Sequence, residues 1–365
     1  MKLNRLLLAQ MRSATRALWR TGPAAPGAAV QQAMKNAAAV QRVAQRQLRD
    51  FAAPPTPIPT PTPTPAPAPI PAPVAVAVPP APERVSGSFL DGSHVNAAGR
   101  REYKLYVPGS IAGSDAPAPL VVMLHGCTQD PEDFATGTQM NALAEEVGCL
   151  VLYPAQSTGA NASRCWNWFN AVDQRRDEGE PSIIAGMTQA IMASNAVDPD
   201  QVYIAGLSAG GAMATIMGTL YPDLYAAVGV HSGLPFASAN DLSSALAAMK
   251  GDFRRSQEGG GQPLPIIVFH GDRDTTVHPA NGDELVAQGA RHLAQPGMAE
   301  PGRVPDGHAY TRTLYPDEGG TVHAEHWLVH GAGHAWFGGN ARGSYTDGKG
   351  PDASREMMRF FRTRR

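Results

Sequence analysis

A serine among small residues follows an apolar segment near the middle of the chain. Gly206–Gly210 reads G-L-S-A-G and so fits the pattern G-x-S-x-G, with Ser208 at its centre. The pattern alone is weak, because the chain contains 38 glycines. However, Val202–Ala205 before it has the residues of a buried strand, and Gly211–Ala214 after it opens a helical pattern. A strand, a sharp turn and a helix would expose the serine hydroxyl, so we predict that Ser208 is a nucleophile rather than part of an ordinary turn.

Two aspartates after a later strand are candidates for the acid that such a serine requires. A serine hydroxyl needs a base to accept its proton, and in the α/β-hydrolase order the serine is followed by an acid and then a histidine. Asp272 and Asp274 follow Ile266–His270 at the carboxyl edge of the expected sheet. We predict Asp274, because Thr275–Val277 beyond it can form a loop over the site. Asp272 remains the alternative, and either carboxylate could instead cap a turn.

The predicted general base is His334. It follows the expected strand Glu325–Val329 and lies in the glycine-rich segment Gly331–Trp336, which can carry a side chain back over the sheet edge. The chain has 11 histidines, so most of them must be structural. His330 is the nearest competitor, but it lies at the strand end, where a packed histidine bonded to the backbone is the favoured interpretation.

Backbone N–H groups are expected to hold the oxyanion of a tetrahedral intermediate, which needs at least two such donors. Ala209, immediately after the nucleophile, can supply one. The second is expected at Cys127, in the loop after the strand Leu120–Leu124. A tight structural turn at His125 and Gly126 is the alternative interpretation, and it is compatible with the same role.

The segments that must position these residues alternate between short aliphatic runs and helical patterns. This alternation is typical of an α/β fold in which a mostly parallel central sheet is flanked by helices, and it predicts one catalytic domain over residues 84–365. Strands are expected near 103–107, 120–124, 150–153, 202–205, 226–231, 266–270 and 325–329. Helices are expected near 134–147, 182–196, 210–221, 281–294 and 353–362.

The N-terminal part has a different character. Residues 1–52 are predicted to be a basic helical segment, because apolar residues recur at three- and four-residue steps over Leu3–Trp19 with arginines on the other faces. Such a segment could contact a membrane or a polymer granule, or could form a solvated helical hairpin. Residues 53–83 alternate proline with small and aliphatic residues, which predicts an extended linker. Arg12 and Arg16 interrupt the first apolar segment, so no ordinary cleaved signal peptide is expected.

Composition removes several other classes of function. The formal net charge of -2 gives no cationic excess for tracking phosphates, so no nucleic-acid partner is expected. No segment approaches the roughly 18 uncharged apolar residues that a membrane span requires. The three cysteines are too few and too widely spaced for a zinc ribbon, and no metal is expected.

Five ordered motifs together resemble the poly(3-hydroxybutyrate) depolymerase-type esterases, which are akin to the feruloyl and acetylxylan esterases of carbohydrate esterase family 1. The motifs are His125–Gln129, Cys165–Phe169, Gly206–Gly211, Asp274–Val277 and Gly333–Trp336, within roughly Val85–Phe361. The resemblance implies an extracellular or periplasmic carboxylic-ester hydrolase without metal or organic cofactor, the alternative being a cytoplasmic, granule-associated one. No separate substrate-binding module is expected after the catalytic domain, unlike in many polymer depolymerases.

Three functions are therefore weighed. The first is hydrolysis of poly- or oligo(3-hydroxybutyrate) and other short hydroxyalkanoate esters through an acyl-enzyme at Ser208. The second is release of feruloyl or acetyl groups from plant polysaccharide, and the third is a surface-binding protein with an incidental esterase fold. Trp166, Trp168 and Trp336 could line an acyl cleft or a sugar-facing surface, or could simply pack in the core.

The cysteines are predicted to divide into one pair and one free thiol. Cys149 lies at the start of an apolar strand, where a cysteine behaves as a small hydrophobic residue. Cys127 and Cys165 lie in loops beside the proposed site residues, and a disulfide between them would hold the donor at Cys127 in place. The alternative is three reduced thiols in a cytoplasmic enzyme.

Overall fold

A computed structural model describes residues 87–252 and 263–364 of the chain. The predicted N-terminal helical segment and the proline-rich linker lie outside these residues. The described part contains one large sheet with helices on both faces and a second, two-stranded sheet. In residues 87–252 and 263–364, no helix is both long enough and apolar enough to cross a membrane.

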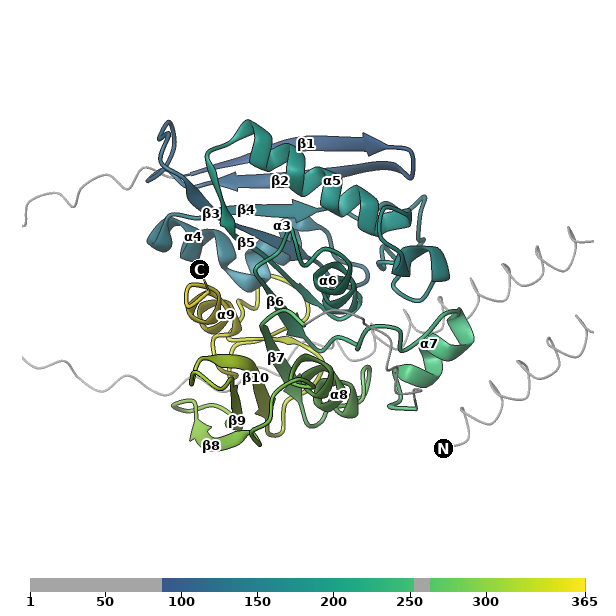
Figure 1. Ribbon diagram of the computed structural model, residues 1–365, viewed down its shortest axis with the longest axis vertical. Helices are drawn as coiled ribbons and strands as arrows, with labels where there is room; N and C mark the ends of the chain where they lie inside the picture. The colour runs from purple at the N-terminus through teal and green to yellow at the C-terminus, as the bar shows by residue number, and fades with distance from the viewer. Residues whose placement is uncertain (1–86, 253–262, 365) are drawn as a thin grey trace, which may run out of the picture. The chain divides into compact units, whose positions relative to one another are not determined.

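The large sheet has a parallel centre and antiparallel edges. Its strands are β1 (Ser88–Asn96), β2 (Gly99–Val107), β3 (Ala118–Leu124), β4 (Leu150–Pro154), β5 (Val197–Leu207), β6 (Ala227–His231), β7 (Ile266–Gly271), β8 (Met298–Arg303), β9 (Ala309–Pro316) and β10 (Val322–Val329). They lie in the order β1-β2-β4-β3-β5-β6-β7-β10-β9-β8 (Figure 1). Neighbours from β4 to β10 in this order are parallel, and the outer pairs on both sides are antiparallel. The carboxyl ends of β3, β5, β7 and β10 therefore meet at one edge of the sheet, where α/β proteins place their sites.

Alternation along the strands divides the core into two layers. On β3, Leu120 and Leu124 belong to one buried cluster, whereas Val121 and Met123 belong to the other, as the two-residue period of a strand requires. The first cluster includes buried residues of α5 (Gly179–Ser194), α6 (Ala209–Leu220), α7 (Leu242–Ala248) and α8 (Ala280–Gly289). The second includes buried residues of α3 (Pro131–Thr138), α4 (Met140–Val147) and α9 (Ala353–Phe361). This is the three-layer α/β arrangement that the sequence predicts.

Several elements differ from the sequence-based expectation. The single helix expected over 134–147 is two helices, because Gln139 has the left-handed φ of 56° and ends α3 where α4 begins. The strands β1, β8 and β9 were not expected from the sequence. Their residues are mostly exposed or half-buried, so they lack the apolar signal of the central strands. The short elements η1 (Ala171–Gln174), β11 (Trp336–Phe337) and β12 (Thr346–Asp347) complete the described part.

Candidate active site

Ser208 lies in a strained turn between β5 and α6. Its φ of 57° and ψ of -120° are uncommon for a residue other than glycine, and such conformations cost on the order of 1–3 kcal/mol where the surroundings impose them. The turn is held by a 2.9 Å hydrogen bond from the Ser208 N–H to the carbonyl of His231. A Cβ atom on Gly210 would collide with the carbonyl oxygen of Leu124. Glycine at this last position of the G-x-S-x-G pattern therefore lets α6 begin directly against β3. The half-buried Ser208 side chain thus lies at the sheet edge, as the sequence predicts.

The predicted acid and base are hydrogen-bonded to each other. His334 Nδ1 donates to Asp274 Oδ2 over 2.7 Å, and the two side chains are 11% and 0% exposed. The other Asp274 oxygen accepts the N–H groups of Thr276 and Val277 at 2.9 and 2.8 Å. Burial by itself would raise the pKa of Asp274, but the hydrogen bonds from His334 and from the Val277 N–H lower it below its usual value. Asp274 therefore stays a carboxylate and keeps the His334 proton on Nδ1, leaving Nε2 able to accept a proton.

His231 connects the turn at Ser208 to the segment Gly331–Phe337, which carries His334 and is called the histidine loop below. Its carbonyl accepts the Ser208 N–H, while its Nε2 accepts the Phe337 N–H at 3.1 Å. Its ring stacks on Trp336, with centroids 5.1 Å apart. Burial lowers the pKa of His231 well below its usual value, so the ring is neutral. Among the described residues, no hydrogen bond reaches the Ser208 hydroxyl from His334, a contact that often tightens only when a substrate binds.

The alternative acid and base form a second pair. His330 Nδ1 lies 3.1 Å from Asp272 Oδ2, and the side chains are 41% and 34% exposed. Asp272 also accepts the Gly331 N–H at 2.7 Å, and His330 Nε2 is 2.9 Å from the Thr311 hydroxyl oxygen. Through its hydrogen bond with the Gly331 N–H, Asp272 therefore stabilises the beginning of the loop that carries His334. The role of Asp274 rather than Asp272 stays a prediction, but the two carboxylates have different partners.

The turn after β3 lies against Ser208. A Cβ atom built on Gly126 would be 3.6 Å from the Ser208 Cβ. The Gly126 N–H donates to Gln129 Oε1 at 2.9 Å, whereas within residues 87–252 and 263–364 the Cys127 N–H has no hydrogen-bond acceptor. The Ala209 N–H is in the first turn of α6 and lacks an intrahelical acceptor, and the helix dipole there favours negative charge. Both predicted oxyanion donors are thus open beside Ser208, although their catalytic role stays a prediction.

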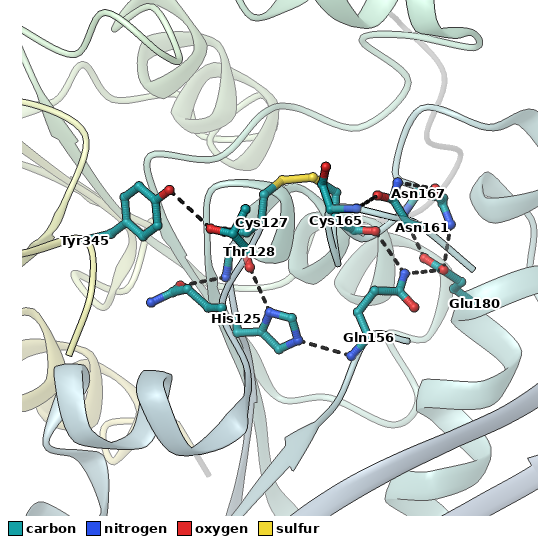
Figure 2. Close-up of a disulfide and its surroundings, with 12 residues drawn as sticks. His125, Cys127, Thr128, Gln156, Asn161, Cys165, Asn167, Glu180 and Tyr345 are labelled. Carbon is teal, nitrogen blue, oxygen red and sulfur yellow. Dashed lines mark hydrogen bonds between the residues drawn. A yellow bond between two sulfur atoms is a disulfide. The ribbon is translucent and has the colours of Figure 1, made fainter. Parts of the chain in front are cut away.

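The predicted disulfide is present. Cys127 and Cys165 are bonded, with their Cα atoms 4.2 Å apart (Figure 2). It joins the turn that carries the Cys127 N–H to the segment before Trp166. Cys149 is free and buried, and burial raises the pKa of its thiol to about 12, so it is unreactive at neutral pH.

The three tryptophans predicted to bind substrate are buried. Trp166 and Trp336 are 0% and 1% exposed, and Trp168 is 6% exposed. The Trp336 indole N–H donates to the Ser354 hydroxyl at 3.1 Å. Burial favours the alternative weighed for these residues, packing in the core, and their contact with substrate stays an untested prediction.

A different aromatic residue is exposed at this edge. Tyr345 is 46% exposed and its hydroxyl lies 3.2 Å from that of Thr128, next to Cys127 (Figure 2). Its carbonyl accepts the Trp336 N–H at 2.7 Å, so Tyr345 spans from the histidine loop to the turn after β3. Sequence reasoning missed it, because the contact joins residues 217 positions apart and Tyr345 has no local motif. No group of three or more His, Cys, Asp or Glu residues in the described part could hold a metal ion.

Comparison with known proteins gives concordant matches. The family model for esterase PHB depolymerase matches residues 101–297. Poly(3-hydroxyalkanoate) depolymerase C of Paucimonas lemoignei is 35% identical over 237 residues, which are 61% of this chain and 56% of that protein. Feruloyl esterase B of Thermothelomyces thermophilus is 28% identical over 58% of this chain and 77% of that protein.

The coverage differs between these relatives and the solved structures. The chain spans about half the length of the depolymerases that it matches, with 48% of the poly(3-hydroxybutyrate) depolymerase of Ralstonia pickettii covered at 29% identity. An acetyl xylan esterase from Aspergillus awamori aligns with a TM-score of 0.61 at 21% identity, over 75% of this chain and 99% of that one. Together with the mostly parallel sheet, this likeness shows the α/β-hydrolase fold.

Proposed function

The chain belongs to the esterase PHB depolymerase family, and from this premise we propose that it is a serine esterase that hydrolyses short hydroxyalkanoate esters, oligomeric or polymeric. The observation that carries the proposal is the 2.7 Å hydrogen bond between His334 and Asp274, at the sheet edge that also holds the strained Ser208. A serine, a histidine and an aspartate in this chain order are the parts that acyl transfer requires.

The proposed reaction has two halves. In the first, His334 Nε2 takes the Ser208 proton as the serine oxygen bonds to the ester carbonyl carbon, and the negative charge on the carbonyl oxygen is held by the N–H groups of Cys127 and Ala209. Protonated His334 then gives the proton to the leaving alcohol as the ester bond breaks. In the second half, water attacks the acyl-serine with His334 again as base, and the acid and free Ser208 are released.

The substrate class rests on the relatives. Among those compared above, the depolymerase of Paucimonas lemoignei, named for poly(3-hydroxyalkanoate), is the most similar at 35% identity. The exposed ring of Tyr345 offers an apolar surface beside Cys127, where a short acyl or alcohol chain could lie. The buried tryptophans leave Tyr345 as the aromatic side chain that we propose contacts substrate.

A second candidate function is removal of acetyl or feruloyl groups from polysaccharide. One observation favours the feruloyl esterases in particular: the matched segment covers 77% and 76% of two feruloyl esterases, but only 56% and 48% of the two depolymerases. Ser208, His334 and Asp274 would perform the same acyl transfer on either substrate.

The test compares substrates with the purified protein. Turnover of a p-nitrophenyl butyrate ester is expected and would be abolished in Ser208→Ala, which separates an esterase from a surface-binding protein with an incidental fold. Hydroxybutyrate trimer should then be cleaved faster than feruloylated arabinoxylan or acetylated xylan. Faster release of ferulate or acetate would transfer the assignment to the second function, and no turnover of any ester would exclude both.

The compartment belongs to the proposal as well. The Cys127–Cys165 disulfide supports an oxidising location, which is extracellular or periplasmic. Contact of the basic N-terminal segment with a membrane or polymer granule lies outside the described residues and stays a prediction.

A further inference from the structure

A buried carboxylate close to the Cys127–Cys165 disulfide takes no part in the proposed reaction (Figure 2). Glu180, near the start of α5, is 4% exposed. Its Oε1 accepts hydrogen bonds from Gln156 Nε2 at 2.5 Å, Asn167 Nδ2 at 2.8 Å and Arg101 Nη2 at 3.1 Å. Its Oε2 accepts the Asn167 N–H at 2.7 Å. All four contacts are donors, so the site suits a carboxylate, which only accepts hydrogen bonds.

Gln156 links the hydrogen bonds of Glu180 to the turn after β3. Its side-chain amide donates to Glu180 and to the carbonyl of Cys165 at 2.9 Å, while its Oε1 accepts from Arg101 Nε at 2.8 Å. Its backbone N–H donates to His125 Nε2 at 3.1 Å. Figure 2 shows these contacts in sequence from Glu180 through Gln156 to His125. The position of the Gln156 backbone is therefore fixed by its own buried side chain.

The contact from Gln156 decides which nitrogen of His125 carries the proton. Because Nε2 accepts the Gln156 N–H, the proton of the neutral ring is on Nδ1, which donates to the carbonyl of Gly126 at 2.8 Å. Burial lowers the pKa of His125 to about 4, so the ring is neutral at pH 7. The same peptide unit that contains the Gly126 carbonyl contains the Cys127 N–H.

A trans peptide unit is planar, and its C=O and N–H point in opposite directions. When His125 holds the Gly126 carbonyl on one side, the Cys127 N–H must point to the other side of that plane. On the preceding peptide, the Gly126 N–H is held by Gln129 Oε1 at 2.9 Å. The Gly126 carbonyl also accepts the Gln129 backbone N–H, over a longer 3.3 Å. The direction of the predicted oxyanion donor therefore depends on the buried side chains of His125 and Gln129 as well as on this turn bond and the disulfide.

We infer that Glu180 is a positioning residue for the oxyanion donor, acting through Gln156 and His125 to orient the Cys127 N–H. The inference rests on the proposed esterase function. Its chemical consequence is selective: the donor binds the charged oxygen of the tetrahedral intermediate more strongly than the carbonyl of the bound ester, so misdirection should slow the reaction without weakening substrate binding.

The matched test is Glu180→Gln beside Glu325→Gln. Glu325 is also fully buried, and it accepts hydrogen bonds from Arg312 at 2.8 Å, the Trp327 indole at 2.7 Å and Arg359 at 2.5 Å, none of which belongs to the turn after β3. Loss of an oxyanion donor costs about 100- to 1000-fold in kcat, so a misdirected one should cost about 10- to 100-fold. With p-nitrophenyl butyrate, we expect this loss in kcat for Glu180→Gln with KM within about twofold of wild type, and near-normal kcat for Glu325→Gln.

An inhibitor pair separates positioning from general damage. A trifluoromethyl ketone forms an oxyanion on the serine, whereas the corresponding alcohol does not. The ketone should bind Glu180→Gln more weakly by about the same factor as kcat/KM falls, and the alcohol should bind as it does to wild type. Gln156→Met, which keeps the side-chain volume but removes the amide contacts, should show the same signature with a smaller factor and serves if Glu180→Gln does not fold.

Three results would overturn the inference. One is unchanged kcat in whichever of these variants folds. Another is equal weakening of ketone and alcohol, which would indicate general distortion of the site. Wild-type protein that hydrolyses no ester would instead refute the proposed function, and the inference with it.

Discussion

Two aspartate–histidine pairs extend from the same two strands, and their surroundings differ. Asp274 and His334 are almost fully buried, and Asp274 has a second oxygen bound by two backbone N–H groups. Asp272 and His330 are each more than a third exposed. An exposed ion pair in water contributes only about 0–1 kcal/mol, whereas a buried hydrogen-bonded carboxylate is held in one place and one charge state. Burial, rather than residue type, therefore separates the proposed reacting pair from the pair that holds the start of the loop carrying His334.

The largest expected effect contrasts the two histidines. His334→Ala should lower kcat/KM for a short p-nitrophenyl ester by about three orders of magnitude, because no base remains for Ser208. His330→Ala should change it by no more than a few fold, because the hydrogen bonds of the His330 side chain within the described residues go to Asp272 and Thr311. Circular dichroism checks that both variants fold. Similar losses of kcat/KM in both variants would contradict the assignment of His334, rather than His330, as the base.

Substitution of the two aspartates should also lower activity unequally, but the difference in kcat between the two variants should be smaller than for the histidines. Asp274→Asn should reduce kcat by about two orders of magnitude or more, because an amide can donate to Nδ1 and so favour the wrong tautomer of His334. Asp272→Asn should reduce it only mildly, through a looser hold on the Gly331 N–H. Steady-state kinetics of the two variants decide the matter. The reverse ranking would transfer the role of the acid to Asp272.

A smaller effect should appear in stability against pH. The pKa of Asp274 is lowered in the folded protein, so its ionised form stabilises the fold above the unfolded pKa of about 3.9. This contribution is lost as the pH falls through the lower, folded pKa. Urea unfolding between pH 6 and pH 3 should therefore show wild type losing stability below about pH 4 more steeply than Asp274→Asn. Parallel curves would mean that the buried carboxylate is not held in its ionised form.

The strand–turn–helix segment around Ser208 and the parallel strands could be predicted from sequence because their signals are local. A buried strand, small residues around Ser208 and a helix are all contiguous, and the five central motifs follow one another along the chain. The edge strands could not be found in this way. Their residues are half-exposed, and β1 is stabilised by pairing with β2 over its whole length rather than by an apolar pattern.

The pairing of acids and bases could not be settled from sequence. The Asp274–His334 contact joins residues 60 apart and the Asp272–His330 contact residues 58 apart, so spacing gives no preference. Likewise, the type of an aromatic residue does not reveal its exposure, so the sequence leaves open whether Trp336 lines a substrate cleft or packs in the core, and it gives no sign that Tyr345 is exposed. Both distinctions depend on contacts that exist only after the sheet has formed.

The most direct test of the buried pair as the reacting pair is covalent labelling of Ser208. Diethyl p-nitrophenyl phosphate transfers its phosphoryl group to an activated serine as p-nitrophenolate leaves, and the modified residue can be located by mass spectrometry of peptides. Wild type and His330→Ala should be labelled at Ser208 at similar rates, and His334→Ala should be labelled at least about 100-fold more slowly. Labelling of another residue, or equal slowing in both histidine variants, would contradict the account.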